Sequence, residues 1–194
     1  WTVHPIQTET TTCIVQRTES IVSLLYVATL YAFVRGWPAL SIAACLVGMA
    51  SKEVMVSAPI MVLIYDRTFV AGSFVAAWSA RRGFYLGLAA TWGLLAFLML
   101  SAPARGGSVG FAMGMSSWDY ALVQCRALVL YLKLAIWPNP LVVDYGTAVA
   151  PSLRSVRPQG LAVVALLAGW AMGLRLRPVL GFVGAIFFLI LAPS

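Results

Sequence analysis

Two charged residues interrupt a long apolar stretch, and a lysine in such a place is suited to binding a phosphate. The stretch runs from Ala39 to Tyr65, and Lys52 and Glu53 are the charges within it. A lysine ammonium is a compact point charge that can hold a phosphate. The alternative is an ordinary charged turn between two helices. A single helix over these 27 residues would be about 40 Å long, too long for a hydrocarbon core of about 30 Å unless tilted. We therefore expect two short helices with a turn within two residues of Lys52.

The polar segment at the start of the chain holds a second set of ionisable side chains. It leads directly into the apolar run from Ile21 to Val34, and Glu19 lies at the edge of that run. An acid in this position is costly in a membrane and indicates function, although a cap and an ion pair with a neighbouring arginine at the interface would also account for it. The candidate substrate-binding residues of this segment are His4, Glu9, Arg17 and Glu19.

Two further candidates lie later in the chain. Arg126 follows Asp119 by seven residues and precedes Lys133 by seven, so the three share one face of a helix. Such a stripe faces a watery cavity, an anionic ligand or lipid headgroups, or its cations snorkel from a surface helix. Asp144 is the acid of a Pro-rich and Gly-containing loop after Trp137. This loop either closes over a groove or simply connects two helices.

These charges stand out because the rest of the chain is apolar. Of 194 residues, 61% are hydrophobic and 10% are charged, against about 45–50% and about 25% in soluble domains. Lipid leaves a choice between helices and a closed barrel, and the unbroken apolar runs lack the alternating polarity of barrel strands. We predict an all-α protein, a polytopic transmembrane bundle of six to seven helices. The net charge of +7 indicates membrane orientation and not a nucleic-acid partner. The three cysteines have no metal-type spacing and are expected to be small buried residues.

The apolar runs also predict where the helices lie. They are expected at residues 19–35, in two short pieces within 39–65, and at 83–101, 118–137, 159–174 and 179–191. The connections are a polar loop at 66–82, a Gly-rich loop at 102–117 and a Pro-rich loop at 138–158. The chain begins without a Met or a signal peptide and stops just after an apolar run. We therefore expect residues 1–194 to be one transmembrane domain, incomplete at both ends.

Positive charge predicts the sides of the membrane. The most basic short connections are residues 66–82 and 175–177, so both are expected in the cytoplasm, Arg81 and Arg175 included, with Arg35 as a third candidate. Asp144 and the turn at Lys52 are then external. The helix at 118–137 lies in the interface, or enters and leaves on the same face. Lys52, Arg126 and the segment 4–19 are expected to line one external, membrane-level cavity, which suits a substrate with a lipid tail and an anionic head.

A series of short motifs resembles a known family in its order and spacing. The motifs are His4-Pro5, Thr8-Glu9, Gln16-Arg17-Thr18-Glu19-Ser20, Ser51-Lys52-Glu53, Tyr65-Asp66, Trp137-Pro138 and Asp144-Tyr145. Together they resemble the membrane part of bacterial tetratricopeptide-repeat proteins, which are similar to the transmembrane-and-tetratricopeptide O-mannosyltransferases of the GT-C class of glycosyltransferases. The resemblance covers essentially the whole chain.

The resemblance implies an inverting enzyme with many transmembrane helices. It would take a sugar from a polyprenyl-phosphate carrier and pass it to a protein or glycan acceptor on the external or lumenal face, here of a bacterial inner membrane. The resemblance implies the polyprenyl-phosphate-linked sugar as donor substrate and no certain cofactor, and it leaves a divalent metal open. The family's general base is an acid in the first external loop, which is expected upstream of Trp1, and the repeats are expected after Ser194. The catalytic acid is therefore unassigned, and this piece alone is expected to be inactive. Lys52 matches a position that resembles the carrier-phosphate contact of related enzymes.

The chemistry of such a transfer suits the charged residues named above. Because the leaving group is a phosphate, the enzyme needs cations against its developing charge and a carboxylate for the acceptor's proton. Lys52, Arg126 and Arg17 suit the first role, and the acids of the chain would only assist the second. Two other functions compete: a transporter or flippase for lipid-linked anionic substrates, and a membrane anchor for a tetratricopeptide scaffold. A transporter is expected to carry a repeat in its hydropathy, and the sequence has none.

Overall fold

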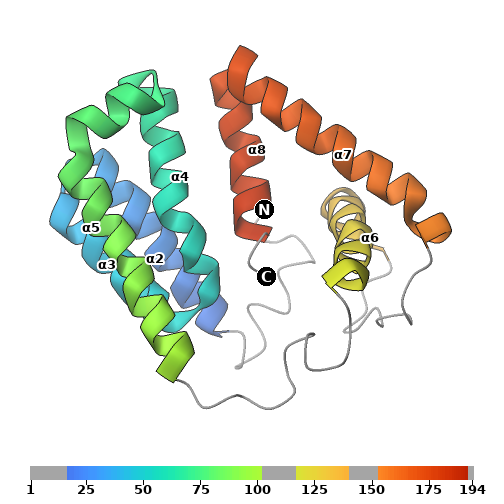
Figure 1. Ribbon diagram of the computed structural model, residues 1–194, viewed down its shortest axis with the longest axis horizontal. Helices are drawn as coiled ribbons and strands as arrows, with labels where there is room; N and C mark the ends of the chain where they lie inside the picture. Colours follow the sequence, from blue (N-terminus) through green and yellow to red (C-terminus); the bar gives the residue numbers. More distant parts are fainter. Residues whose placement is uncertain (1–16, 102–116, 140–152, 192–194) are drawn as a thin grey trace. The chain divides into compact units, whose positions relative to one another are not determined.

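The computed structural model describes residues 17–101, 117–139 and 153–191. These residues form seven α-helices with one 3-10 and one π segment, and they contain no strand (Figure 1). The elements are α2 (Arg17–Val34), α3 (Pro38–Ser51), the 3-10 helix η3 (Glu53–Ser57), α4 (Ala58–Tyr65), the π-helix η4 (Asp66–Ala71), α5 (Phe74–Ser101), α6 (Ser117–Ile136), α7 (Leu153–Leu176) and α8 (Pro178–Leu191). The predicted all-α class is confirmed for this part of the chain.

The helices belong to two compact units. The larger unit, residues 10–103 and 170–194, contains α2 to α5, the last turns of α7, and α8. The smaller unit, residues 1–9 and 104–169, contains α6 and the rest of α7. Each unit is described by itself.

In the larger unit the chain runs back and forth four times. Lys52, at the end of α3, contacts Glu19 at the start of α2, so these two helices are antiparallel. The chain then returns, because the ring of Tyr65 at the end of α4 lies 6.1 Å from that of Phe33 near the end of α2. Helix α5 runs the other way again, and the indole nitrogen of its Trp92 donates a hydrogen bond to the carbonyl of Val56, 3.0 Å away.

Local sequence explains why the first two helices end where they do. Gly36 has φ +72°, and the amides of Gly36 and Trp37 donate to the carbonyls of Phe33 and Ala32 at 3.0 and 2.8 Å. This is the Schellman pattern, in which a left-handed glycine satisfies the last helical carbonyls. Pro38 then begins α3 at the position where a proline is best tolerated.

The interruption at Lys52 is a true break in the helix. Lys52 has φ −160° and ψ 150°, an extended conformation, between α3 and η3. Its amide still donates to the carbonyl of Gly48 at 3.1 Å, so it ends one helix before the next turn begins. The predicted break at this residue is confirmed, as is the out-and-back course of residues 39–65.

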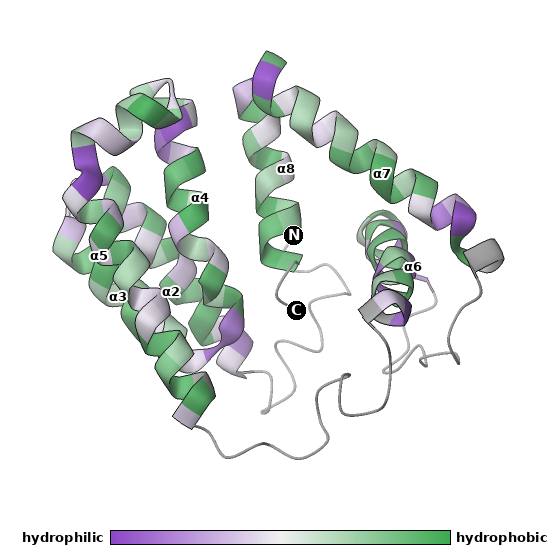
Figure 2. Cartoon of the chain, viewed as in Figure 1, coloured by the Kyte–Doolittle hydropathy of each residue, from purple (hydrophilic) through white to green (hydrophobic). Residues whose placement is uncertain are grey.

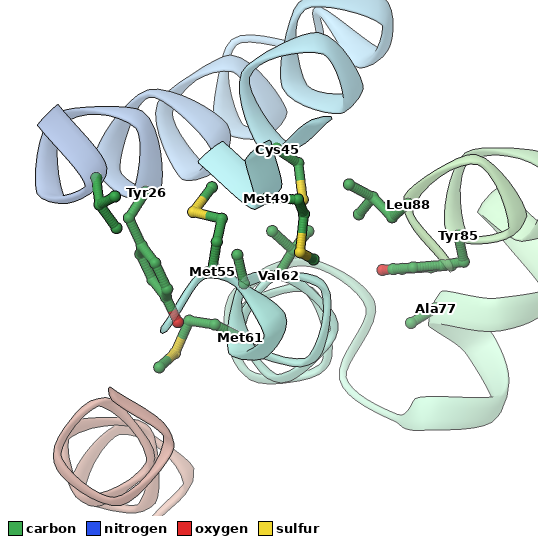
Figure 3. Close-up of a cluster of buried hydrophobic side chains, with 11 residues drawn as sticks. Tyr26, Cys45, Met49, Met55, Met61, Val62, Ala77, Tyr85 and Leu88 are labelled. Atoms are coloured by element: carbon green, nitrogen blue, oxygen red, sulfur yellow. The ribbon is translucent and has the colours of Figure 1, made fainter. Parts of the chain in front are cut away.

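The core of the larger unit lies where α2, α3, η3 with α4, and α5 meet (Figure 3). Figure 3 shows Tyr26 from α2 and Tyr85 from α5 on opposite sides of a group of sulfur-containing side chains. Three of the methionines are almost fully buried: Met49, Met55 and Met61. Methionine adapts its shape to irregular gaps, which suits a junction of short, broken helices.

Small polar side chains join the helices inside this core. The hydroxyl of Ser41 donates to the carbonyl of Thr29 at 2.8 Å. The hydroxyls of Tyr26 and Ser57 lie 3.2 Å apart. These contacts tie α2 to α3 and to η3.

Two predicted loops are partly helical, which corrects the sequence analysis. Residues 66–82 were expected to be a polar loop, but η4 continues α4 to Ala71, and α5 already begins at Phe74. Gly72, with φ +76°, separates them, and the hydroxyl of Ser73 accepts the amide of Ala76 at 3.1 Å as a helix cap. The Pro-rich loop was expected to reach residue 158, but α7 begins at Leu153 and includes Pro158 in its second turn.

Two helical segments of the described residues are long and apolar enough to cross a membrane, judged by length and composition. They are Glu53–Ala71 and Val156–Leu176, and three shorter apolar helices accompany them, Thr18–Val34, Pro38–Ser51 and Pro178–Leu191. Figure 2 shows the hydrophilic residues gathered at helix ends and corners, with hydrophobic lengths between them.

Candidate functional site

The charged turn at Lys52 is the candidate site that the structure builds most clearly. The ammonium of Lys52 forms an ion pair with the carboxylate of Glu19, in the first turn of α2. Each of the two side chains is 33% exposed. The next residue, Glu53, is exposed and has no ion-pair partner among the described residues. A solvent-reached cation, paired with Glu19 and followed in the chain by Glu53, thus lies at one end of the helices.

The backbone around this turn is held from several directions. Trp92 of α5 donates to the carbonyl of Val56, and Tyr26 of α2 meets the hydroxyl of Ser57. Gly48 of α3 packs against Met55, whose side-chain atoms lie 2.7–2.8 Å from where a Cβ of residue 48 would be. The turn is therefore fixed by contacts with α2, α3 and α5.

The opposite end of the larger unit carries a dense group of arginines, which we call the arginine end. Contacts between aromatic rings define this end. The ring centroids of Phe33 and Phe84, which stack, are 5.4 Å apart, and those of Phe69 and Phe182 of α8 are 5.2 Å apart. The arginines that follow α2, lie in η4, lie in the first half of α5 or precede α8 are Arg35, Arg67, Arg81, Arg82, Arg175 and Arg177. Glu19 and Lys52 are at the other ends of the same helices. Charge is therefore divided unequally between the two ends.

A buried acid at the arginine end was not recognised from the sequence as a structural centre. Asp66 is fully buried and accepts two hydrogen bonds of 2.9 Å from Nη1 of Arg81. It also accepts a hydrogen bond of 2.5 Å from the hydroxyl of Tyr85. Arg81 and Tyr85 are four residues apart on α5 and so share a face. That spacing and the acid at the end of an apolar run are the sequence signals of the cluster.

Arg81 lies where α5 kinks. Its φ of −136° and ψ of 31° are not helical, and they separate residues 74–80 from the longer second part of α5. Because the same residue holds Asp66, the ion pair fixes the direction in which α5 leaves the η4 corner. The cluster thus positions two helices, with no group in it that reaches the Lys52 turn.

The smaller unit contains the cationic stripe. Asp119, Arg126 and Lys133 all lie in α6, and both cations are exposed. Their spacing of seven residues places them on one face, with about 10 Å of axial rise between neighbours. The helix and its common face are as predicted.

The structure thus brings together some of the predicted site residues. Lys52 and Glu19 form an ion pair at one turn, which Glu53 follows in the chain, and Arg17 is the first residue of α2. The role of Arg126, which belongs to the other unit, and the shared cavity stay predictions. His4, Glu9 and Asp144 lie outside the described residues. The described part of the chain contains no group of three or more metal-ligating side chains that could hold a metal ion.

No family model, curated protein or solved structure matches the chain.

Proposed function

We propose that the chain is part of a multi-pass protein of the bacterial inner membrane. Apolar side chains that point away from the helix contacts support this. Leu24 and Val27 of α2 are 69% and 63% exposed, and Leu161, Val164 and Leu176 of α7 are 72%, 63% and 72% exposed. Single exposed apolar residues are normal in soluble proteins, but long exposed apolar faces are not. Lipid is the surrounding that makes such faces stable.

The unequal charge of the two ends supports an orientation. Six arginines and one buried aspartate lie at the arginine end, whereas the opposite end has one arginine (Arg17), one lysine and two glutamates. Lysine and arginine are enriched in short cytoplasmic connections. The arginine end is therefore cytoplasmic in this proposal, and the Lys52 turn is at the external surface.

Within that membrane protein, we assign the Lys52 turn to the head of a polyprenyl-phosphate carrier. The observation that carries this assignment is the ion pair of Lys52 with Glu19, partly exposed, in a helix break. A phosphate offers Lys52 the same kind of oxygen ligand as the Glu19 carboxylate. Apolar residues on both sides of the break provide the surface along which the isoprenoid tail lies. Charged hydrogen bonds of this kind contribute about 1.5–3 kcal/mol.

The function that fits such a site best is sugar transfer at the external face, as in the GT-C enzymes that the sequence motifs resemble. Lys52 stabilises the negative charge that grows on the carrier phosphate as the bond from the sugar carbon to the phosphate oxygen breaks. The acceptor oxygen attacks the sugar carbon, and a carboxylate takes the acceptor proton. No described acid is assigned that role.

The test uses the complete protein in sealed proteoliposomes. Polyprenyl-phosphate carrying radiolabelled mannose or glucose is supplied with a pool of peptides that contain serine and threonine. The proposal expects label on the peptides, and much less with Lys52→Ala than with Arg177→Ala as control. Movement of intact donor across the bilayer without transfer would instead identify a transporter. If the protein neither transfers the sugar nor moves the donor, and does not bind the carrier, the result would instead support a membrane anchor.

A further inference from the structure

A cavity of about 630 Å³ opens at the arginine end, on the far side of the bundle from the Lys52 turn. It lies between the turn that joins α2 to α3 and the kink of α5. Its lining combines two cations, a hydroxyl and two aromatic rings, from Arg81, Arg82, Ser79, Phe33 and Phe84. The volume falls within the range of about 300–1,000 Å³ that small-molecule sites occupy.

The charge of this cavity is suited to an anion. Asp66 occupies only Nη1 of Arg81, and the side chain of Arg81 is 37% exposed. Among the described residues, no hydrogen-bond partner is assigned to its other two nitrogens. Arg82 is exposed and forms no ion pair with a described residue. Two guanidinium groups against one carboxylate give the cavity a net positive charge, and guanidinium donors match phosphate oxygens in pairs.

The position of the cavity is suited to a lipid. Trp37 and Trp78 flank it in sequence and are 47% and 48% exposed, and tryptophan concentrates at the level of the lipid headgroups. Val34 at the end of α2 and Leu40 near the start of α3 are 53% and 52% exposed, and they offer an apolar surface to acyl chains. A soluble anion would use the cations but not this surface.

We propose that this cavity binds the phosphodiester of an anionic phospholipid of the cytoplasmic leaflet. The guanidinium groups of Arg81 and Arg82 hold the phosphate, and Phe33 and Phe84 form the apolar wall. Ser79 lines the cavity, and its hydroxyl donates to the carbonyl of Ala76 at 3.1 Å. Gly36 and Gly83 have no side chain and so leave space in the cavity for the ligand. A Cβ at either position would meet nothing within 4 Å. Because Arg81 also binds Asp66, the lipid is linked through Arg81 to the corner between α4 and α5.

This inference uses the proposed membrane orientation but not the sugar transfer. A soluble phosphate has the same chemistry as the lipid head, so the experiment includes both. It uses the complete protein, purified in detergent, and measures binding by native mass spectrometry. Phosphatidylglycerol, phosphatidylcholine and inorganic phosphate are the three probes.

The proposal expects phosphatidylglycerol to bind in preference to the other two probes. Arg82→Ala is expected to weaken this binding about tenfold or more, as the loss of a charged hydrogen bond. Arg177→Ala removes the same charge at the same end but outside the cavity, and is expected to cost at most about fivefold. Gly83→Leu changes no charge but fills the cavity, and is expected to reduce binding as strongly as Arg82→Ala.

Equal losses with Arg82→Ala and Arg177→Ala, together with unchanged binding in Gly83→Leu, would show a diffuse surface charge and overturn the proposal. Equally tight binding of inorganic phosphate would overturn the lipid as the occupant. Thermal unfolding of each variant in detergent shows that it is folded. Binding of polyprenyl phosphate, measured in parallel, depends on Lys52 and not on Arg82, so failure here is distinct from failure of the carrier site.

Discussion

The ammonium of Lys52, in the break between α3 and η3, forms an ion pair with the carboxylate of Glu19 in the first turn of α2. Two residues 33 positions apart therefore meet at one end of the antiparallel pair α2 and α3. Since both side chains are partly exposed, a ligand can reach the pair without unfolding the turn. Two predictions about carrier binding depend on this relationship.

Lys52→Ala is expected to weaken binding of polyprenyl phosphate with little loss of stability. The lost contact with the phosphate is worth about 1.5–3 kcal/mol, which is about ten- to a hundredfold in affinity. The lost pair with Glu19 is partly solvated and contributes about 1 kcal/mol or less to folding. Native mass spectrometry in detergent measures the first effect and thermal unfolding the second. Arg177→Ala, at the opposite end, is the control, and an unchanged affinity in Lys52→Ala would remove Lys52 from the site.

Glu19→Gln is expected to act in the opposite direction. In the empty site the Glu19 carboxylate competes with the ligand for Lys52, so its neutralisation frees the ammonium. Binding of polyprenyl phosphate should then tighten by up to about fivefold, the value of a partly exposed ion pair. The same titration measures it. A large loss of affinity in Glu19→Gln would mean that the acid contacts the ligand and does not merely hold the lysine.

The sequence was informative where one residue decides the local structure. Lys52 and Glu53 interrupted an apolar run that was too long for one crossing, and the chain breaks there. Hydrophobic runs also located α3 and α8. The helices predicted at 83–101 and 159–174 begin earlier, at Phe74 and Leu153. The spacing of the stripe that contains Arg126 placed it correctly on one helix.

Features that depend on contacts between distant residues were not predictable in this way. The four-residue spacing of Arg81 and Tyr85 is visible in the sequence, but nothing there joins it to Asp66. The arginines were assigned to a loop because charge usually marks loops. Burial of the Asp66 carboxylate with both partners allows Arg81 to lie within a helical segment. Pro158 was used as a helix boundary, yet α7 begins before it, because one missing hydrogen bond near a helix start is tolerated.

The corner between α7 and α8 depends on a glycine. A Cβ at Gly181 would lie 2.6 Å from the Cα and the amide nitrogen of Leu174, and backbone atoms cannot give way without moving a helix. Gly181→Ala is therefore expected to destabilise the protein by about 1–3 kcal/mol. Gly169→Ala is the matched control in α7, where a Cβ meets nothing within 4 Å, and it is expected to stabilise by about 0.5–1 kcal/mol. Thermal unfolding in detergent measures both, and equal effects would contradict the packing.

Removal of either partner of the Asp66–Arg81 pair is expected to have unequal effects. Asp66 is fully buried, whereas the Arg81 side chain is 37% exposed. Arg81→Met leaves a buried carboxylate without its cation and is expected to cost about 3–5 kcal/mol. Asp66→Asn leaves a cation that reaches water, and its amide oxygen still accepts from Tyr85, so the cost should be clearly smaller.

Combining the two changes checks the cause of that difference. The double variant has no buried charge left unpaired, so it should recover part of the stability that Arg81→Met loses. Thermal unfolding of the natural protein, the two single variants and the double variant completes this double-mutant cycle. Additive losses would mean that the residues do not act as a pair.

The unequal charge of the two ends predicts which surface each end faces. Glu53, at the Lys52 turn, and Arg177, at the arginine end, are both exposed, so a cysteine at either position is open to a reagent. The test uses a protein without its three natural cysteines. Glu53→Cys is expected to react with a membrane-impermeant maleimide added to spheroplasts, in which the inner membrane is intact and the outer membrane has been removed. Arg177→Cys should react only after the inner membrane is permeabilised, because arginine-rich connections stay in the cytoplasm. The reverse result would show that the protein has the opposite orientation, with the Lys52 turn in the cytoplasm. It would exclude transfer at the external face. Labelling of both positions from outside would contradict the placement of the Lys52 turn and the arginine end on opposite sides of the bilayer.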